Sequence, residues 1–137
     1  MADLNKLADL QHVRVTANKT LTAADQGIVQ DVVVDGVILT LPSTAADLEF
    51  YVANRGRIGT GALPDGAVQN KSVAVTVAPA AADGFTGNGF TPAINKAAIN
   101  TKATAQVGDY IRIAGTGTAG VTAWYILEAS GTWARQA

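Results

Sequence analysis

The chain has 137 residues, 48% of them apolar and only 15% charged, which fits one folded domain and excludes a disordered tail or a solvated helical rod. The formal net charge of −1 gives no field that would gather nucleic acid or an anionic membrane, so neither is an expected partner. Cysteine is absent, which excludes disulfides and thiolate metal sites and suits synthesis in a reducing cytoplasm. We expect neither a secretion signal nor a membrane-spanning segment, because no apolar run of about 18 residues occurs.

The first twelve residues predict an arm. Leu4, Leu7 and Leu10 are spaced three apart behind a possible N-cap, a pattern typical of a short helical turn with one apolar face. So short a segment cannot sustain a free helix. We therefore expect residues 1–12 to form an N-terminal arm that buries these leucines against a neighbouring subunit, and residues 13–137 to form a single β domain.

From His12 the apolar pattern changes to a period of two, which is typical of strands. Two β-rich runs, 28–34 and 37–41, are joined by Asp35-Gly36 and predict a β-hairpin. Residues 43–48 could make one turn of helix. The complete set of expected strands is 12–16, 19–22, 28–34, 37–41, 49–54, 71–78, 97–105, 109–113, 121–128 and 133–136.

Many short strands without a helix of ordinary length predict an all-β fold, an antiparallel β-sandwich of jelly-roll type. Two long glycine-rich loops, 55–70 and 79–96, interrupt the strands. The alternation places one side of each strand in the core. The residues expected there are Val13, Val15, Leu39, Leu41, Val52, Val75, Ile111, Ile113, Trp124 and Ile126.

Residues for catalysis are scarce. The one histidine, His12, sits in an alternating strand, where a strand-face or interface role outweighs that of a general base. No serine occupies a Gly-x-Ser-x-Gly turn, and the glycine cluster 56–61 lacks the Gly-Lys-Ser/Thr of a phosphate loop. The loop around Asp83 and Asn88 has no regular array of oxygen ligands. We therefore expect no catalytic residues, no cofactor, no metal site and no enzymatic activity.

The 55–70 loop is a candidate for contact with a partner protein, and this signal is stronger than any for catalysis. Arg55 and Arg57 stand at its start, and arginine is favoured at interfaces. The glycines between and after them allow both arginines to reach one surface, with Ile58 and Leu63 filling shallow pockets between them. An interface role is therefore preferred over a solvated loop.

Several runs together resemble the small β-sandwich modules of tailed-bacteriophage virions, which occur in capsid decoration (cement) proteins and in tail fibres. These runs are Thr20-Leu-Thr-Ala-Ala-Asp-Gln-Gly27, Leu39-Thr-Leu-Pro-Ser43, Phe50-Tyr-Val-Ala-Asn54, Val73-Ala-Val-Thr-Val77, Val107-Gly-Asp-Tyr-Ile-Arg-Ile113, Trp124-Tyr-Ile and Ser130-Gly-Thr-Trp133. A short chain that begins at Met1 is more similar to a cement protein than to a module of a long fibre.

The resemblance implies a structural protein on the outer surface of a capsid, made in the host cytoplasm. Its partners would be the major capsid protein and itself, as a homodimer or homotrimer. The main alternative is a tail-fibre or carbohydrate-binding module, and a small hydrolase or lyase is a third. An aromatic side chain exposed on a groove would favour carbohydrate, whereas burial of Trp124 and Trp133 would count against it.

Overall fold

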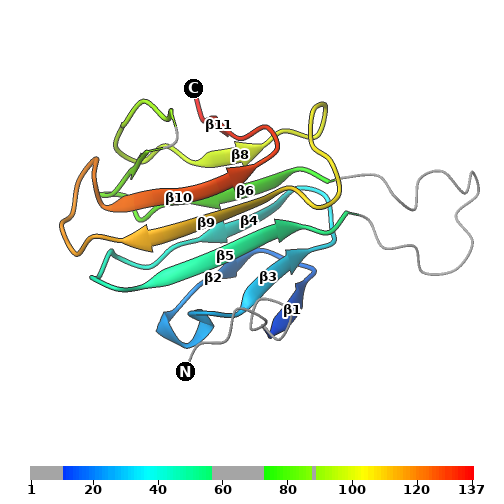
Figure 1. The fold of residues 1–137 in the computed structure, drawn as a ribbon, viewed down its shortest axis with the longest axis horizontal. Coiled ribbons are helices and arrows are strands. Elements are labelled where there is room, and N and C mark those ends of the chain that lie inside the picture. The colour runs from blue at the N-terminus through cyan, green and yellow to red at the C-terminus, as the bar shows by residue number, and fades with distance from the viewer. Residues whose placement is uncertain (1–10, 57–72, 88) are drawn as a thin grey trace, which may run out of the picture.

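The computed structural model describes residues 11–56, 73–87 and 89–137. They form two β-sheets (Figure 1), of which sheet A has the strand order β1-β3-β5-β9-β10-β7 and sheet B the order β11-β8-β6-β4-β2. The strands are β1 (His12–Val15), β2 (Lys19–Thr20), β3 (Val29–Val32), β4 (Val37–Thr40), β5 (Glu49–Asn54), β6 (Val75–Ala78), β7 (Phe85–Thr86), β8 (Ala98–Asn100), β9 (Tyr110–Gly115), β10 (Trp124–Ser130) and β11 (Ala134–Arg135). The all-β expectation is confirmed.

Through its first six strands the chain alternates between the two sheets. β1, β3 and β5 lie side by side in sheet A, and each pair is parallel. β2, β4 and β6 do the same in sheet B. Each connection therefore carries the chain across from one sheet to the other, so neighbours within a sheet are never consecutive in this half.

The second half of the chain adds antiparallel pairs. β9 pairs with β5 and β10 in sheet A, while β8 pairs with β6 and β11 in sheet B. Only β7, which is parallel to β10, departs from this pattern. Both sheets are thus mixed, and the expectation of antiparallel pairing fails for the first six strands.

The hairpin expected at Asp35-Gly36 is wrong. Gly36 has a positive φ of 80°, as a tight turn needs, but the turn leads from β3 in sheet A to β4 in sheet B. Its backbone and side chain are bound elsewhere: Gly36 N donates to Ala74 O at 3.1 Å, and Asp35 Oδ1 accepts from Ala74 N at 2.8 Å. An Asp-Gly pair specifies a reversal of the chain but not the pairing of the strands around it.

The helical turn expected at 43–48 is also absent. Thr44 N donates to Asp83 Oδ2 at 3.1 Å and Thr44 Oγ1 donates to Ala123 O at 2.6 Å, so this segment is bound to distant residues. Within the described residues the helical turn is a 3₁₀ helix at Ala23–Asp25, where Thr22 and Asp25 form a capping box. No helix within the described ranges is long and apolar enough to cross a membrane.

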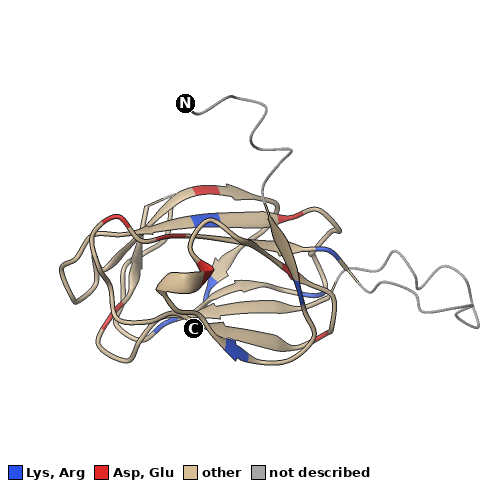
Figure 2. Cartoon of the chain, turned by 90° about the horizontal axis from the view of Figure 1, so that it is seen from below, with Lys and Arg blue, Asp and Glu red and all other residues tan. Residues whose placement is uncertain are grey.

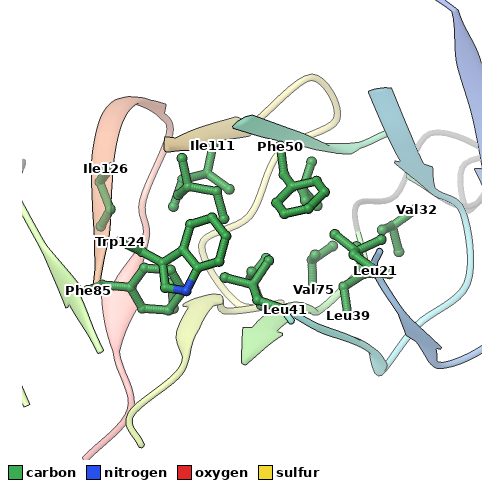
Figure 3. Packing of buried hydrophobic residues seen from close by; sticks show 14 of the residues in the cluster. Leu21, Val32, Leu39, Leu41, Phe50, Val75, Phe85, Ile111, Trp124 and Ile126 are labelled. Atoms are coloured by element: carbon green, nitrogen blue, oxygen red, sulfur yellow. The ribbon is translucent and has the colours of Figure 1, made fainter. Parts of the chain in front are cut away.

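Side chains from both sheets form one hydrophobic cluster (Figure 3), with Trp124 and Phe50 its largest fully buried members. Their ring centroids are 5.7 Å apart. Nine of the ten residues expected in the core belong to this cluster, and the tenth, Val13, packs against it. The period of two therefore identified the inward face correctly for the strands that carry these ten residues.

Candidate functional site

The outer face of sheet A carries several polar and charged side chains on neighbouring strands. Charged side chains are few and scattered over the protein (Figure 2), but strand register aligns several of them here, because alternate residues of each strand point away from the core. One row across the strands is His12, Val29, Tyr51, Arg112 and Glu128, and the next is Arg14, Asp31, Ala53, Tyr110 and Ser130.

Asp31 is the centre of this face. Its carboxylate is largely covered, with the side chain 13% exposed, so it needs polar partners. His12 Nδ1 lies 2.9 Å from Asp31 Oδ2, and Arg55 Nε lies 3.9 Å from Asp31 Oδ1. The second distance is an ion pair but exceeds a hydrogen bond. Asp31 Oδ1 thus accepts no hydrogen bond from the part of the chain that the structure describes.

Two tyrosines stand beside this carboxylate. The rings of Tyr51 and Tyr110 have centroids 5.2 Å apart and are tilted by 34°. Burial raises the pKa of Tyr51, with a smaller contribution from Glu128. Hydrogen bonding to Glu128 raises the pKa of Tyr110, and burial adds to it. Both phenols therefore remain protonated at neutral pH and can donate hydrogen bonds.

Arg112 holds the adjacent acidic side chains in place. Its Nη2 and Nε both donate to Glu49 Oε1, at 2.6 and 3.2 Å, and its Nη1 lies 3.5 Å from Glu128 Oε1. The Glu49 carboxylate raises the pKa of Arg112. This arrangement links β5, β9 and β10 and keeps Glu128 next to the phenol of Tyr110.

A shallow depression of about 200 Å³ lies between these groups. Three of its lining residues, Val29, Asp31 and Ala53, are buried. The other polar groups that line it are the imidazole of His12, the guanidinium of Arg55 and the phenols of the two tyrosines. The lining residues are His12, Val29, Asp31, Tyr51, Ala53, Arg55, Gly108 and Tyr110.

A buried amide network supports the end of β5 that carries Arg55. Asn54 Nδ2 donates to Val73 O and to Asn100 Oδ1, both at 2.7 Å, and Asn54 Oδ1 accepts from Gly56 N at 3.0 Å. Asn100 Nδ2 in turn donates to Asp109 Oδ2 at 3.1 Å. Gly56 and Val73 flank residues 57–72, so one side chain ties together the backbone on both sides of that segment.

Of the residues predicted to contact a partner, only Arg55 lies in the described part of the chain. It is 53% exposed and belongs to the depression. Leu4, Leu7, Leu10, Arg57, Ile58 and Leu63 lie outside the described residues.

The sequence reasoning missed Asp31, Tyr51 and Tyr110 as site residues. Alternation assigns Tyr51 and Tyr110 to outward faces, but nothing in the sequence says that β5 and β9 are neighbours. His12 was expected on a strand face, and that is where the structure places it. Its contact with Asp31 depends on the parallel pairing of β1 with β3.

The side chains of the depression supply hydrogen-bond donors, hydrogen-bond acceptors and aromatic rings. The pair of His12 and Asp31 resembles a base with its orienting carboxylate, but none of the lining residues is a serine, threonine or cysteine. Within the described ranges no group of three histidine, aspartate or glutamate side chains could hold a metal ion. Comparisons with protein-family models, with curated proteins and with solved structures find no match to this chain.

Proposed function

We propose that this chain is a non-enzymatic structural protein of a phage virion that cements the capsid by bridging neighbouring major capsid proteins. In this proposal the two sheets form a β-sandwich of jelly-roll type, and the protein sits on the outer capsid surface as a homodimer or homotrimer. The supporting features are the all-β fold, the resemblance of its strand and turn sequences to virion modules, and one geometric relationship on the outer face of sheet A.

That relationship is the meeting of His12 and Arg55 at Asp31. His12 is the last residue of the predicted N-terminal arm, and Arg55 is the first residue of the loop expected to clamp a partner. The two segments with predicted partner contacts are therefore joined to the β domain next to the same carboxylate. A protein that grips a neighbour with both segments needs their attachment points on one face, and this arrangement meets that need.

The environment of the tryptophans supports the structural role over a tryptophan-based sugar platform. Trp124 is fully buried. Trp133 packs against the core, and its Nε1 donates to Ser130 O at 3.0 Å. The Trp124 indole is therefore not free to stack on a ligand, and the Trp133 indole is partly buried against the core.

Fractionation of virions tests the proposal. Heads and tails are separated from purified particles that contain this chain, and each fraction is probed with an antibody against the recombinant protein. We expect the chain in the head fraction, released by mild denaturant before the shell dissociates. Recovery with the tails would contradict the proposal and favour the fibre alternative. A chain that lacks residues 2–10 tests the arm: it should fold and should no longer bind stripped capsids.

A further inference from the structure

The depression on the outer face of sheet A has an aromatic wall, donors of both charged and neutral type, and a buried oxygen of Asp31 that accepts no hydrogen bond from the described residues. We propose that it binds a single saccharide ring, with the ring packed against Tyr51 and Tyr110 and its hydroxyls bonded to Asp31 and Arg55. This inference rests on the geometry of the depression alone, and saccharide binding here would favour the carbohydrate-binding alternative over the proposed capsid role.

The aromatic wall is the first step. Tyr51 and Tyr110 come from neighbouring strands, and both rings line the depression. Their centroids are 5.2 Å apart and the ring planes are tilted by 34°, so the two rings pack against each other and form one aromatic cluster at the depression. The C–H groups on one face of a pyranose can pack on such a ring, while the Tyr110 phenol stays hydrogen-bonded to Glu128.

The spacing of Asp31 and Arg55 is the second step. Arg55 Nε and Asp31 Oδ1 are 3.9 Å apart, too far for a hydrogen bond. One oxygen about 2.8 Å from each atom would accept from Nε and donate to Oδ1. A hydroxyl can do both at once, whereas a carboxylate cannot donate and an ammonium cannot accept. Because Arg55 is 53% exposed, its side chain can shift to admit the ligand and uncover Oδ1.

Charge and size restrict the ligand further. Asp31 balances Arg55, so an anion would meet the carboxylate and a cation would compete with the guanidinium. A neutral polyhydroxylated ligand avoids both conflicts. The depression, at about 200 Å³, is smaller than the roughly 300–1,000 Å³ of sites for drug-sized molecules. It therefore suits one ring rather than an oligosaccharide, with affinity on the order of 1 mM.

Nitrogen-15 heteronuclear NMR tests this directly. D-glucose, D-galactose, D-mannose and N-acetyl-D-glucosamine are titrated separately into the labelled protein. We expect at least one of them to produce saturable shifts at the amides of Ala53, Gly108 and Tyr110. Tyr110→Ala and Asp31→Asn should each weaken that binding by about tenfold or more. Tyr125→Ala, which removes a tyrosine of β10 that does not line the depression, should leave it unchanged.

Two controls keep the result decisive. Spectra of each variant without ligand show whether the fold is retained, and Tyr110→Phe, which keeps the ring, should retain most of the binding if stacking dominates. The proposal is overturned if none of the four sugars produces saturable shifts, or if binding survives both Tyr110→Ala and Asp31→Asn. Saturable shifts at the same amides with N-acetylglutamate alone would replace it with a site for acidic side chains of a protein partner.

Discussion

The indole of Trp124 and the ring of Phe50 lie 5.7 Å apart at the centre of the core, although 73 residues separate them in the chain (124 minus 50, less one). Trp124 belongs to β10 and Phe50 to β5, with β9 paired between them. The contact therefore forms only when sheet A is assembled across both halves of the chain.

Replacing Trp124 with alanine should strongly destabilise the fold. The side chain is fully buried, so the substitution loses its transfer free energy and leaves a cavity, a combined cost of about 3–5 kcal/mol. Denaturant unfolding followed by circular dichroism measures it. Tyr125→Ala on the same strand is the control, because that side chain is 50% exposed. Equal losses for the two variants would show that the indole contributes no more than a surface ring.

Loss of the buried Asn54 amide should lower the free energy of unfolding more than loss of an exposed amide that also bonds to the backbone. Asn54→Ala leaves Gly56 N and Val73 O without their side-chain partner, and each buried unsatisfied group costs about 1–3 kcal/mol. Asn18 is the matched case, since its Oδ1 accepts from Ile38 N at 2.9 Å in an exposed setting. Asn18→Ala should cost about 1 kcal/mol. Comparable midpoints of urea unfolding for the two variants would contradict this prediction.

Gly131 should tolerate alanine far less than Gly36 does. Both have a positive φ, +88° and +80°, which costs an L-residue about 1–2 kcal/mol. At Gly36 a Cβ would meet nothing within 4 Å, whereas at Gly131 it would overlap the Asp109 carboxyl group. That carboxyl accepts from Asn100 Nδ2 and Gln106 N, so moving it disturbs the buried amide network.

Thermal unfolding of the two alanine variants measures the difference. We expect Gly131→Ala to lose about 1–3 kcal/mol more than Gly36→Ala, as for other overpacked interiors. If Gly36→Ala proves the more damaging of the two, the turn at Asp35 rather than contact with Asp109 limits substitution.

The strands and the core could be predicted from the sequence because both depend on local alternation. Val75 and Val77 face inward whichever strand lies beside them. Strand order is different in kind. Val29 pairs with Tyr51 only because β4 crosses to sheet B and the chain returns, and the Asp35-Gly36 turn is compatible with either pairing.

The candidate site depends on that strand order and was therefore missed. Tyr110 is 59 positions beyond Tyr51 in the chain, and the two meet only through the antiparallel register of β5 with β9. Arg55 could be singled out from the sequence, because it stands at the edge of a long loop and arginine is favoured at interfaces. This argument requires no knowledge of its neighbours in the fold. Its carboxylate partner, Asp31, could not be identified from the sequence, because it lies on a different strand of the sheet.

Alkaline pH should destabilise the protein through the tyrosine pair. The pKa values of Tyr51 and Tyr110 are raised above the ordinary 10.0, by burial and by hydrogen bonding to Glu128, respectively. A folded-state pKa above the unfolded value means that the stabilisation is fully present below pH 10 and lost as pH rises through the folded values. Tyrosinate absorbance should therefore contain a late component that Tyr110→Phe reduces. If Tyr125→Phe removes that component instead, the assignment to this pair is wrong.

Reversal of charge at the predicted clamp should weaken capsid binding without unfolding the protein. The Arg55→Glu, Arg57→Glu double variant places acidic groups where the proposal has arginines pairing with carboxylates or carbonyls of the major capsid protein. Arg55 is more than half exposed and 3.9 Å from its one described carboxylate partner, so the pair itself contributes about 0–1 kcal/mol, and urea unfolding of the isolated variant measures any further loss from repulsion between the introduced carboxylate and Asp31. The Lys96→Glu, Lys102→Glu variant makes the same change in net charge at residues flanking β8 of sheet B.

The measurement is the protein concentration that half-saturates stripped capsids. We expect the same concentration for wild type and the lysine variant, and a higher concentration for the arginine variant. Saturation of all three at one concentration would remove Arg55 and Arg57 from the interface, because repulsion from two introduced carboxylates in a desolvated contact must slow association or speed release.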